Sequence, residues 1–135
     1  MAYLFDTDTI SNTMKKAPSP SLLRRLAATP PEQQFTTTIT VGEMTYGALR
    51  SSRAEEILDR LTKQVWPNIQ ILPFDMPAAE TYGRLRAALE RVGLTVAEPD
   101  LRIAAIAVSR GLMVVTGNVR HFVKVPDLDV EDWLV

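Results

Sequence analysis

The chain has 135 residues, of which 46% are hydrophobic and 23% charged, as is typical of a soluble globular protein. The absence of cysteine excludes disulfides and thiolate metal sites, so any metal must bind oxygen or nitrogen ligands. The net charge of −1 argues against bulk attraction to a polyanion, but not against local binding by clustered basic residues. No apolar stretch is long enough to span a bilayer and the start lacks a signal peptide's features. We therefore expect a cytoplasmic protein with a single domain over residues 1–135.

Along the chain, strand-like apolar runs alternate with segments of helical period. Strands are expected at Tyr3–Phe5, Phe35–Ile39, Ile69–Leu72 and Leu112–Val115, and a last short one near Leu128–Val130. Helices are expected from Asp6 to about Lys15, from Ser19 or Ser21 through Ala28, and over Thr40–Arg50, Ala54–Val65, Pro77–Val92 and Pro99–Arg110. This alternation predicts an α/β fold with three layers, in which helices flank a mostly parallel sheet of four to five strands.

Several residues predict where the helices begin and end. Thr40 and Glu43 form a capping box, in which Glu43 would bond back to the amide of Thr40. Glu98 precedes Pro99 and is a candidate cap for the next helix. Gly93 and Gly111 each follow a helical segment and are expected to end it.

Four oxygen-bearing side chains fall where a strand or loop ends or a helix begins. Asp6 and Asn118 come just after strand-like runs, whereas Glu43 and Asp100 lie in first helical turns. Open parallel sheets bind ligands at the carboxyl ends of their strands. We therefore predict that these four side chains converge on one edge of the sheet.

Each of these residues also has a purely structural explanation. Asp6 or Asp8 can cap the first helix, and Asp100 in a first turn is favoured by the helix dipole. Glu43 can complete its capping box, and Asn118 after a glycine is a common turn residue. Because a residue can cap a helix and still bind a ligand, both interpretations stay open.

Clustered carboxylates repel one another, since two unit charges about 4 Å apart cost roughly 4 kcal/mol at an effective dielectric near 20. A divalent cation reverses the sign of that interaction. Mg²⁺ prefers oxygen ligands, keeps several waters and typically uses one or two carboxylates directly, and Mn²⁺ suits the same ligands. The acidic set therefore predicts a site for Mg²⁺ or Mn²⁺.

Five segments in series resemble the PIN-domain ribonucleases, and within them the VapC-type toxins of prokaryotic toxin–antitoxin pairs. The resemblance covers nearly the whole length in the expected order, and it lies in the segments Tyr3–Asp8, Ile39–Gly47, Asp100–Ala105, Gly111–Phe122 and Val125–Trp133. It implies a PIN fold, metal-dependent endoribonuclease activity on an RNA substrate, and an inhibitory antitoxin as partner. A homodimer, which can join a larger toxin–antitoxin assembly, is expected as well.

The resemblance carries Asp6, Glu43 and Asp100 onto the metal-site acids of the family. Asn118 falls at a fourth position, which is Asp in some members and Asn in others. The side chains expected to support the acids are Thr7, Asp8 and Thr116.

A mechanism follows as a hypothesis. The metal would lie between Asp6 and Asp100, with Glu43 close by or holding a metal-bound water that attacks the RNA phosphorus. Basic residues outside the pocket would hold the strand, and the candidates are Arg50, Arg102 and Arg120.

Two other interpretations were weighed. One is a receiver-like signalling module that accepts a phosphoryl group, but no Asp follows the strand-like run Phe35–Ile39. The other is a PIN scaffold that has lost catalysis and acts by protein binding, and the intact acids argue against it. Among the remaining residues, His121 is expected at the surface, and Met44 and Leu49 are expected to face inward from their helix.

Overall fold

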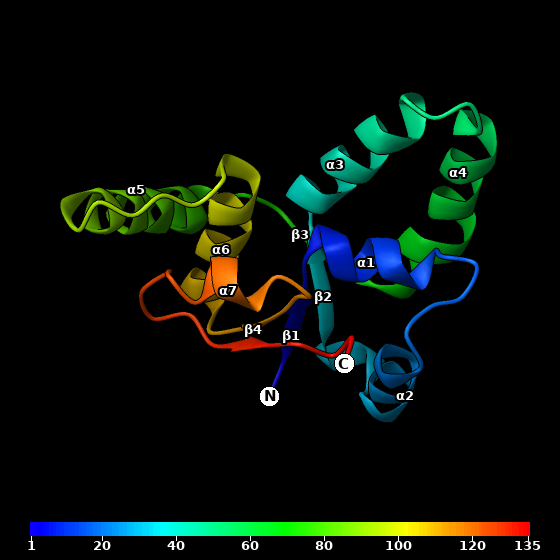
Figure 1. Ribbon diagram of the computed structural model, residues 1–135, viewed down its shortest axis with the longest axis horizontal. Helices are drawn as coiled ribbons and strands as arrows, with labels where there is room; N and C mark the ends of the chain where they lie inside the picture. Colours follow the sequence, from blue (N-terminus) through cyan, green and yellow to red (C-terminus); the bar gives the residue numbers. More distant parts are fainter.

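A five-stranded sheet forms the centre of the computed structural model, which describes all residues 1–135. All strands are parallel, in the order β3-β2-β1-β4-β5. Their bounds are Tyr3–Phe5 (β1), Gln34–Thr37 (β2), Gln70–Leu72 (β3), Met113–Val115 (β4) and Val130–Glu131 (β5). Helices cover both faces, with α5 and α6 on one side and α1, α2 and α4 on the other (Figure 1). The predicted three-layer α/β fold with a parallel sheet is confirmed.

Seven α-helices connect the strands. Their bounds are Thr7–Thr13 (α1), Pro20–Ala28 (α2), Thr38–Leu49 (α3), Ala54–Arg60 (α4), Met76–Arg91 (α5), Glu98–Arg110 (α6) and Val119–Phe122 (α7). The segment predicted as one helix over Ala54–Val65 is α-helical only to Arg60 and continues as a π-helical turn through Val65. Gly93 and Gly111 both adopt positive φ just past a helix, as predicted.

The alternation of side chains along β1 divides the core in two. Leu4 faces the side of α5 and α6 together with Val114 of β4, and both are fully buried. Phe5 and Val115 point to the opposite side, where they pack with Trp133. Because successive strand residues face opposite ways, this pattern leaves both faces of the central strands apolar. The strand register sets Phe5 beside Val115, so β1 and β4 end side by side.

The predicted start of α3 is wrong by two residues. The helix begins at Thr38, and Thr37 is the cap, whose hydroxyl accepts a 3.1 Å hydrogen bond from the amide of Thr40. β2 accordingly ends at Thr37, which pairs with Leu72 of β3. The capping box of Thr40 and Glu43 is therefore absent, which leaves the Glu43 carboxylate free for other contacts.

Three other expectations need correction. Glu98 does not cap α6 but is its first residue after Ala97, and its carboxylate instead accepts hydrogen bonds from Tyr82 and Arg102. The last strand lies at Val130–Glu131, slightly beyond its predicted place, and the short helix α7 was not predicted. Leu49 is exposed rather than inward-facing.

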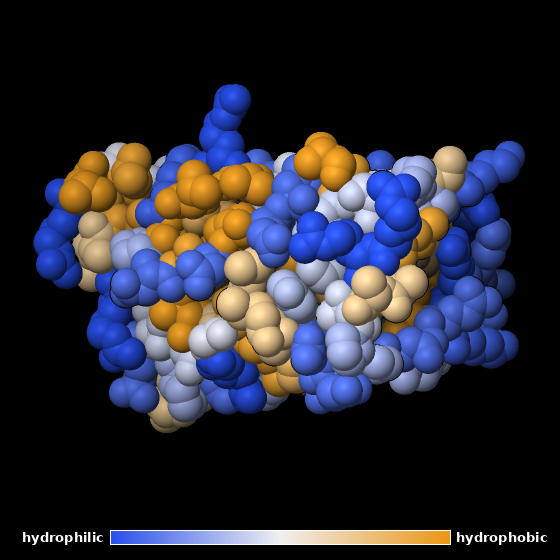
Figure 2. Space-filling view, turned by 90° about the horizontal axis from the view of Figure 1, so that it is seen from below, coloured by the Kyte–Doolittle hydropathy of each residue, from blue (hydrophilic) through white to orange (hydrophobic).

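The carboxyl ends and the amino ends of the strands lie at two opposite edges of the sheet. The helices α1, α3 and α6 begin at the edge where β1, β2 and β4 end (Figure 1). Figure 2 views the molecule from below Figure 1, where hydrophobic residues gather on the half of the surface that lies on the side of α5 and α6. No helix has the length and apolar character needed to cross a membrane.

Candidate metal and nucleic-acid site

Asp6 is the most deeply buried acid of the chain, with 2% of its surface exposed. It follows β1 and caps α1, because its Oδ1 accepts a 2.9 Å hydrogen bond from the amide of Thr9. Its Oδ2 accepts a 2.6 Å hydrogen bond from the hydroxyl of Thr116. Burial raises the pKa of Asp6 to about 6, although the hydrogen bonds from Thr116 and Thr9 pull it back down.

Thr116 links Asp6 to the end of β4. Its hydroxyl oxygen also accepts a 2.8 Å hydrogen bond from the amide of Asn118. Thr9 adds a second link, since its hydroxyl donates to the carbonyl of Val115 at 2.8 Å. These bonds hold the loop after β4 against the start of α1, and Thr116 supports Asp6 as the sequence led us to expect.

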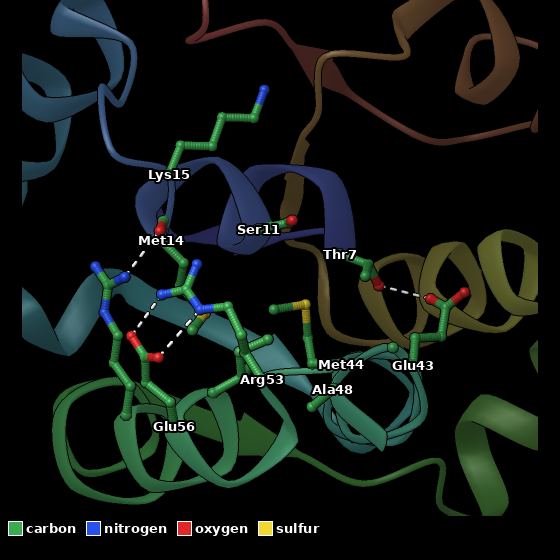
Figure 3. A pocket seen from close by; sticks show the side chains of 12 residues that line it. Thr7, Ser11, Met14, Lys15, Glu43, Met44, Ala48, Arg53 and Glu56 are labelled. Carbon is green, nitrogen blue, oxygen red and sulfur yellow. Dashed lines mark hydrogen bonds and ion pairs between the residues drawn. The ribbon is translucent and has the colours of Figure 1, made fainter. Parts of the chain in front are cut away.

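Glu43 reaches toward α1 from the second turn of α3. Its carboxylate accepts a 2.6 Å hydrogen bond from the hydroxyl of Thr7, as Figure 3 shows. The same hydroxyl lies 3.1 Å from that of Thr40. Thr7 therefore orients Glu43 and connects it to Asp6, its neighbour in the chain.

Asp100 lies in the first turn of α6 and is partly buried. Burial raises its pKa to about 6, and the negative charges of Glu43 and Asp8 raise it further. Asp100 and Glu43 come from different helices, yet they lie close enough to repel each other. The structure thus brings the predicted acids of α3 and α6 together, on the edge where Asp6 also lies.

His121 is a neighbour of this site that sequence reasoning missed. Its Nε2 lies 3.2 Å from Oδ2 of Asp100 and accepts a 3.2 Å hydrogen bond from the amide of Ala97. One ring nitrogen cannot donate to a carboxylate and accept from an amide at the same time. The two contacts therefore compete, and nothing in the residue pattern around His121 signals a contact formed with α6.

The remaining predicted site residues are placed less centrally. Asn118 is exposed, its side chain makes no capping hydrogen bond, and its backbone amide donates to the hydroxyl of Thr116. Asp8 is exposed in the first turn of α1 and acts on Asp6 and Asp100 through its charge. Arg120 is exposed on α7.

Two of the three predicted RNA-binding arginines lie on the side of α3 and α6. Arg102 lines a hollow that also contains Glu43 and Tyr46. Arg50 lies over the ring of Tyr46, with its guanidinium carbon 5.4 Å from the ring centre. The sequence alone could not distinguish these two from Arg120.

The donor set suits a hard cation that keeps much of its water. No group of three Asp, Glu or His side chains is close enough to hold one ion directly. Mg²⁺ commonly uses only one or two carboxylates and fills its octahedron with water. Asp6 and Asp100, whose pKa values burial raises to about 6, are the two acids that a bound cation would stabilise most. The residues therefore fit a hydrated ion rather than a closed protein cage.

A second hollow of about 490 Å³ opens beside Glu43, between α1, α3 and α4 (Figure 3). Met14, Met44, Ala48 and Ile57 provide apolar side chains to its lining. Besides Glu43, the charged residues in the lining are Lys15, Arg53, Glu56 and Arg60. Such an apolar lining with charged residues suits a protein segment with both kinds of side chain.

Comparison with known proteins connects this geometry to a family. The PIN domain family model matches residues 3–128. The tRNA(fMet)-specific endonuclease VapC of Salmonella typhimurium is 34% identical over 133 residues, which cover 98% of each chain. Ribonuclease VapC2 of Haemophilus influenzae (strain Rd) is 30% identical, with 99% of each chain covered.

Solved structures agree with these relatives. The DNA-bound VapBC of Salmonella typhimurium superposes with a TM-score of 0.91 at 34% identity, over 98% of each chain. FitAcB of Neisseria gonorrhoeae superposes with a TM-score of 0.89 at 28% identity, over 97% of each chain. The chain therefore belongs to the PIN-domain family. Its relatives within that family are the VapC ribonucleases, which confirms the resemblance seen in the sequence.

Proposed function

We propose that the protein is a metal-dependent endoribonuclease of the VapC type. One observation supports this more than any other: Asp6 and Asp100, whose pKa values burial raises to about 6, lie at the starts of α1 and α6, and the charge of Glu43 on α3 acts on Asp100. Carboxylates arranged in this way cost free energy unless a cation is bound. The names of its relatives, which are ribonucleases, favour RNA as the substrate. The cytoplasm is where such a substrate would be met.

In this proposal each residue of the site has a separate role. Asp6 and Asp100 would hold Mg²⁺ or Mn²⁺, and Glu43 would lie beside the ion. A bound ion of this kind supplies an activated water and neutralises the charge that develops on the phosphoryl oxygens. Thr116 and Thr9 keep both oxygens of Asp6 oriented, since each donates to one of them.

Glu43, oriented by Thr7, is the residue that accepts a proton from the attacking water. Attack of water on phosphorus breaks the bond to the 3′ oxygen, which leaves a 3′-hydroxyl and a 5′-phosphate. The Salmonella relative is named for its specificity toward tRNA(fMet), so initiator tRNA is the first substrate to assay.

An antitoxin is the proposed protein partner. Relatives were solved as VapBC and FitAB complexes, some of them bound to DNA. The 490 Å³ hollow beside Glu43 is the place we assign to a segment of that partner, because it combines apolar side chains with charged ones. A Met14→Arg variant should lose co-purification with the product of a small neighbouring gene but keep cleavage, since Met14 lies at the C-terminal end of α1 and Asp6 at its N-terminal end.

A homodimer is proposed from the exposed surface of α3. Leu49 is more than half exposed on this helix, and an apolar side chain of this size is usually covered. Sedimentation of the pure protein measures this directly.

The nuclease proposal is tested with pure protein and a mixed RNA substrate. Cleavage in Mg²⁺ that stops with EDTA supports it. Absence of cleavage with Mg²⁺ and with Mn²⁺ would instead favour the inactive scaffold or the signalling module. Retention of cleavage in EDTA would contradict the role of the metal.

A further inference from the structure

A hollow of about 630 Å³ lies between α3 and α6, next to the acids. The residues that line it are Thr38, Ile39, Gly42, Glu43 and Tyr46 of α3 and Glu98, Pro99 and Arg102 of α6. Its volume is within the range of small-ligand sites. Because Glu43 belongs to this hollow and also to the acidic site, whatever occupies the hollow lies beside the proposed reaction centre.

Arg102 is held in place by a network around Glu98. Its Nε donates to the Glu98 carboxylate at 3.3 Å, and its guanidinium carbon lies 5.8 Å and 5.7 Å from the ring centres of Phe74 and Tyr82. Glu98 is fixed in turn by the hydroxyl of Tyr82 at 2.7 Å and by Nη1 of Arg86 at 3.3 Å. The guanidinium therefore has a defined position although it is half exposed.

Most donors of Arg102 remain available in that position. A guanidinium has five N–H groups, and only the one on Nε forms a hydrogen bond here. Arg86, which belongs to the same network, already uses Nε on Glu90 and Nη1 on Tyr82 and Glu98. Two terminal nitrogens that are free and held in one plane form the fork that binds phosphate through paired hydrogen bonds.

Tyr46 supplies a different surface to the same hollow. Its side chain is 62% exposed, which is unusual for a large aromatic residue on a helix. The guanidinium of Arg50 lies over the ring, so positive charge is present on this side too. Unpaired bases stack on aromatic rings of this kind.

We propose that this hollow holds the nucleotide next to the bond that is cut, with Arg102 binding its phosphate and Tyr46 stacking on its base. This inference rests on the proposed nuclease function and specifies its substrate as a single-stranded segment. A base within a duplex cannot stack on Tyr46, because its faces are already covered by neighbouring bases. Glu98 and Tyr82 act as positioning residues, since both contact the guanidinium of Arg102.

The test is RNA binding without cleavage. A fluorescent single-stranded oligoribonucleotide is titrated with the protein in EDTA, at several salt concentrations. Arg102→Ala should weaken binding about tenfold and reduce the salt slope by about one counterion. Tyr46→Ala should weaken binding by about tenfold, whereas Tyr46→Phe, which keeps the ring, should bind like the wild type.

Arg91→Ala is the matched control for charge, because Arg91 is exposed at the far end of α5. Tyr82→Phe removes the hydroxyl that holds Glu98 but keeps the ring under Arg102, and it should weaken binding less than Arg102→Ala does. In Mg²⁺, Arg102→Ala should raise KM by about the same factor and leave kcat nearly unchanged, as expected of a binding contact.

Equal RNA affinity of the Arg102→Ala and Arg91→Ala variants would overturn the proposal. A second result would also overturn the proposal. If the Arg102→Ala variant is a monomer where the wild type is a dimer, and its RNA affinity returns to the wild-type value when a higher protein concentration restores the dimer, then the hollow is an interface between copies. If the proposed nuclease function is wrong, the result is different, since the wild type would then not cleave RNA in Mg²⁺ at all. Cleavage by the wild type with unchanged KM in Arg102→Ala removes only the subsite.

Discussion

The hydroxyl of Thr116 donates a 2.6 Å hydrogen bond to the carboxylate of Asp6, although the two residues are 110 positions apart in the chain. Both lie just past the ends of paired strands, β1 and β4. The bond places one oxygen of the most buried acid at a fixed point of the sheet edge. The geometry of the acidic site therefore depends on the pairing of these two strands.

Thr116→Val should destabilise the protein by about 1–3 kcal/mol, because valine has the same shape but leaves Asp6 and the amide of Asn118 without their partner. Chemical denaturation measures this loss. Thr36→Val is the matched control, since Thr36 is equally buried and its hydroxyl bonds to the carbonyl of Phe5. Only Thr116→Val should weaken Mg²⁺ binding. A similar loss of Mg²⁺ affinity in both variants would show that Thr116 has no special role at the site.

Asp6→Asn and Asp100→Asn should each reduce RNA cleavage by at least about a hundredfold. Loss of a residue that only supports a metal ligand costs up to about a hundredfold, and loss of a ligand itself should cost at least as much. Each variant lacks one negative charge that the proposed cation needs. Asp59→Asn serves as the control, because Asp59 is exposed on α4 and pairs with Lys63. Circular dichroism should show an unchanged fold. Full activity in either pure variant would remove these acids from the mechanism.

The metal-free protein should lose stability as pH rises from about 4 to about 6. Burial raises the pKa of Asp6 and of Asp100 from 3.8 to about 6. The folded state then binds protons more tightly than the unfolded chain in this window, so protonation favours folding. The contribution is complete below pH 3.8 and is lost above about pH 6. For Asp6 it amounts to at most about 3 kcal/mol.

Denaturation of the wild type and of Asp6→Asn across this pH range, in EDTA, measures that contribution. The variant should show a smaller fall in the free energy of unfolding than the wild type. Parallel curves would mean that the Asp6 carboxyl titrates normally in the folded protein.

Mg²⁺ should raise the stability of the wild type by mass action, by about 2.7 kcal/mol at a hundredfold excess over its dissociation constant. The gain should be larger at pH 7 than at pH 5, because the carboxylates must be ionised to bind the ion. Thermal unfolding with Mg²⁺ and with an equal ionic strength of NaCl separates binding from screening. The same shift with both salts would argue against a specific site.

The elements that the sequence predicts well are those with a strong local signal. Tyr3–Phe5 forms the predicted strand, and Gly111 ends α6 in the left-handed conformation that glycine adopts without strain. The order of the acids along the chain, together with the rule that parallel strands bind ligands at their carboxyl ends, placed Asp6 and Asp100 on one edge.

The expectations that failed depended on contacts between distant residues. The segment Thr36–Thr40 offers several threonines that can cap a helix, and the pairing of Thr37 with Leu72 in the sheet decides which one does. Glu98 has a cap-like position next to Pro99, but Tyr82 from the preceding helix binds its carboxylate. The neighbour of Asp100, His121, comes from α7, and local sequence carries no sign of that contact.

In the proposed reaction, water attacks the phosphorus of RNA with the help of Asp6, Glu43 and Asp100. Mapping the ends of the RNA fragments tests it most directly. We expect fragments with a 5′-phosphate and a 3′-hydroxyl, formed with Mg²⁺ or Mn²⁺ and absent in EDTA. Fragments that end in a 2′,3′-cyclic phosphate would contradict it, because they require attack by the 2′-hydroxyl of the RNA itself.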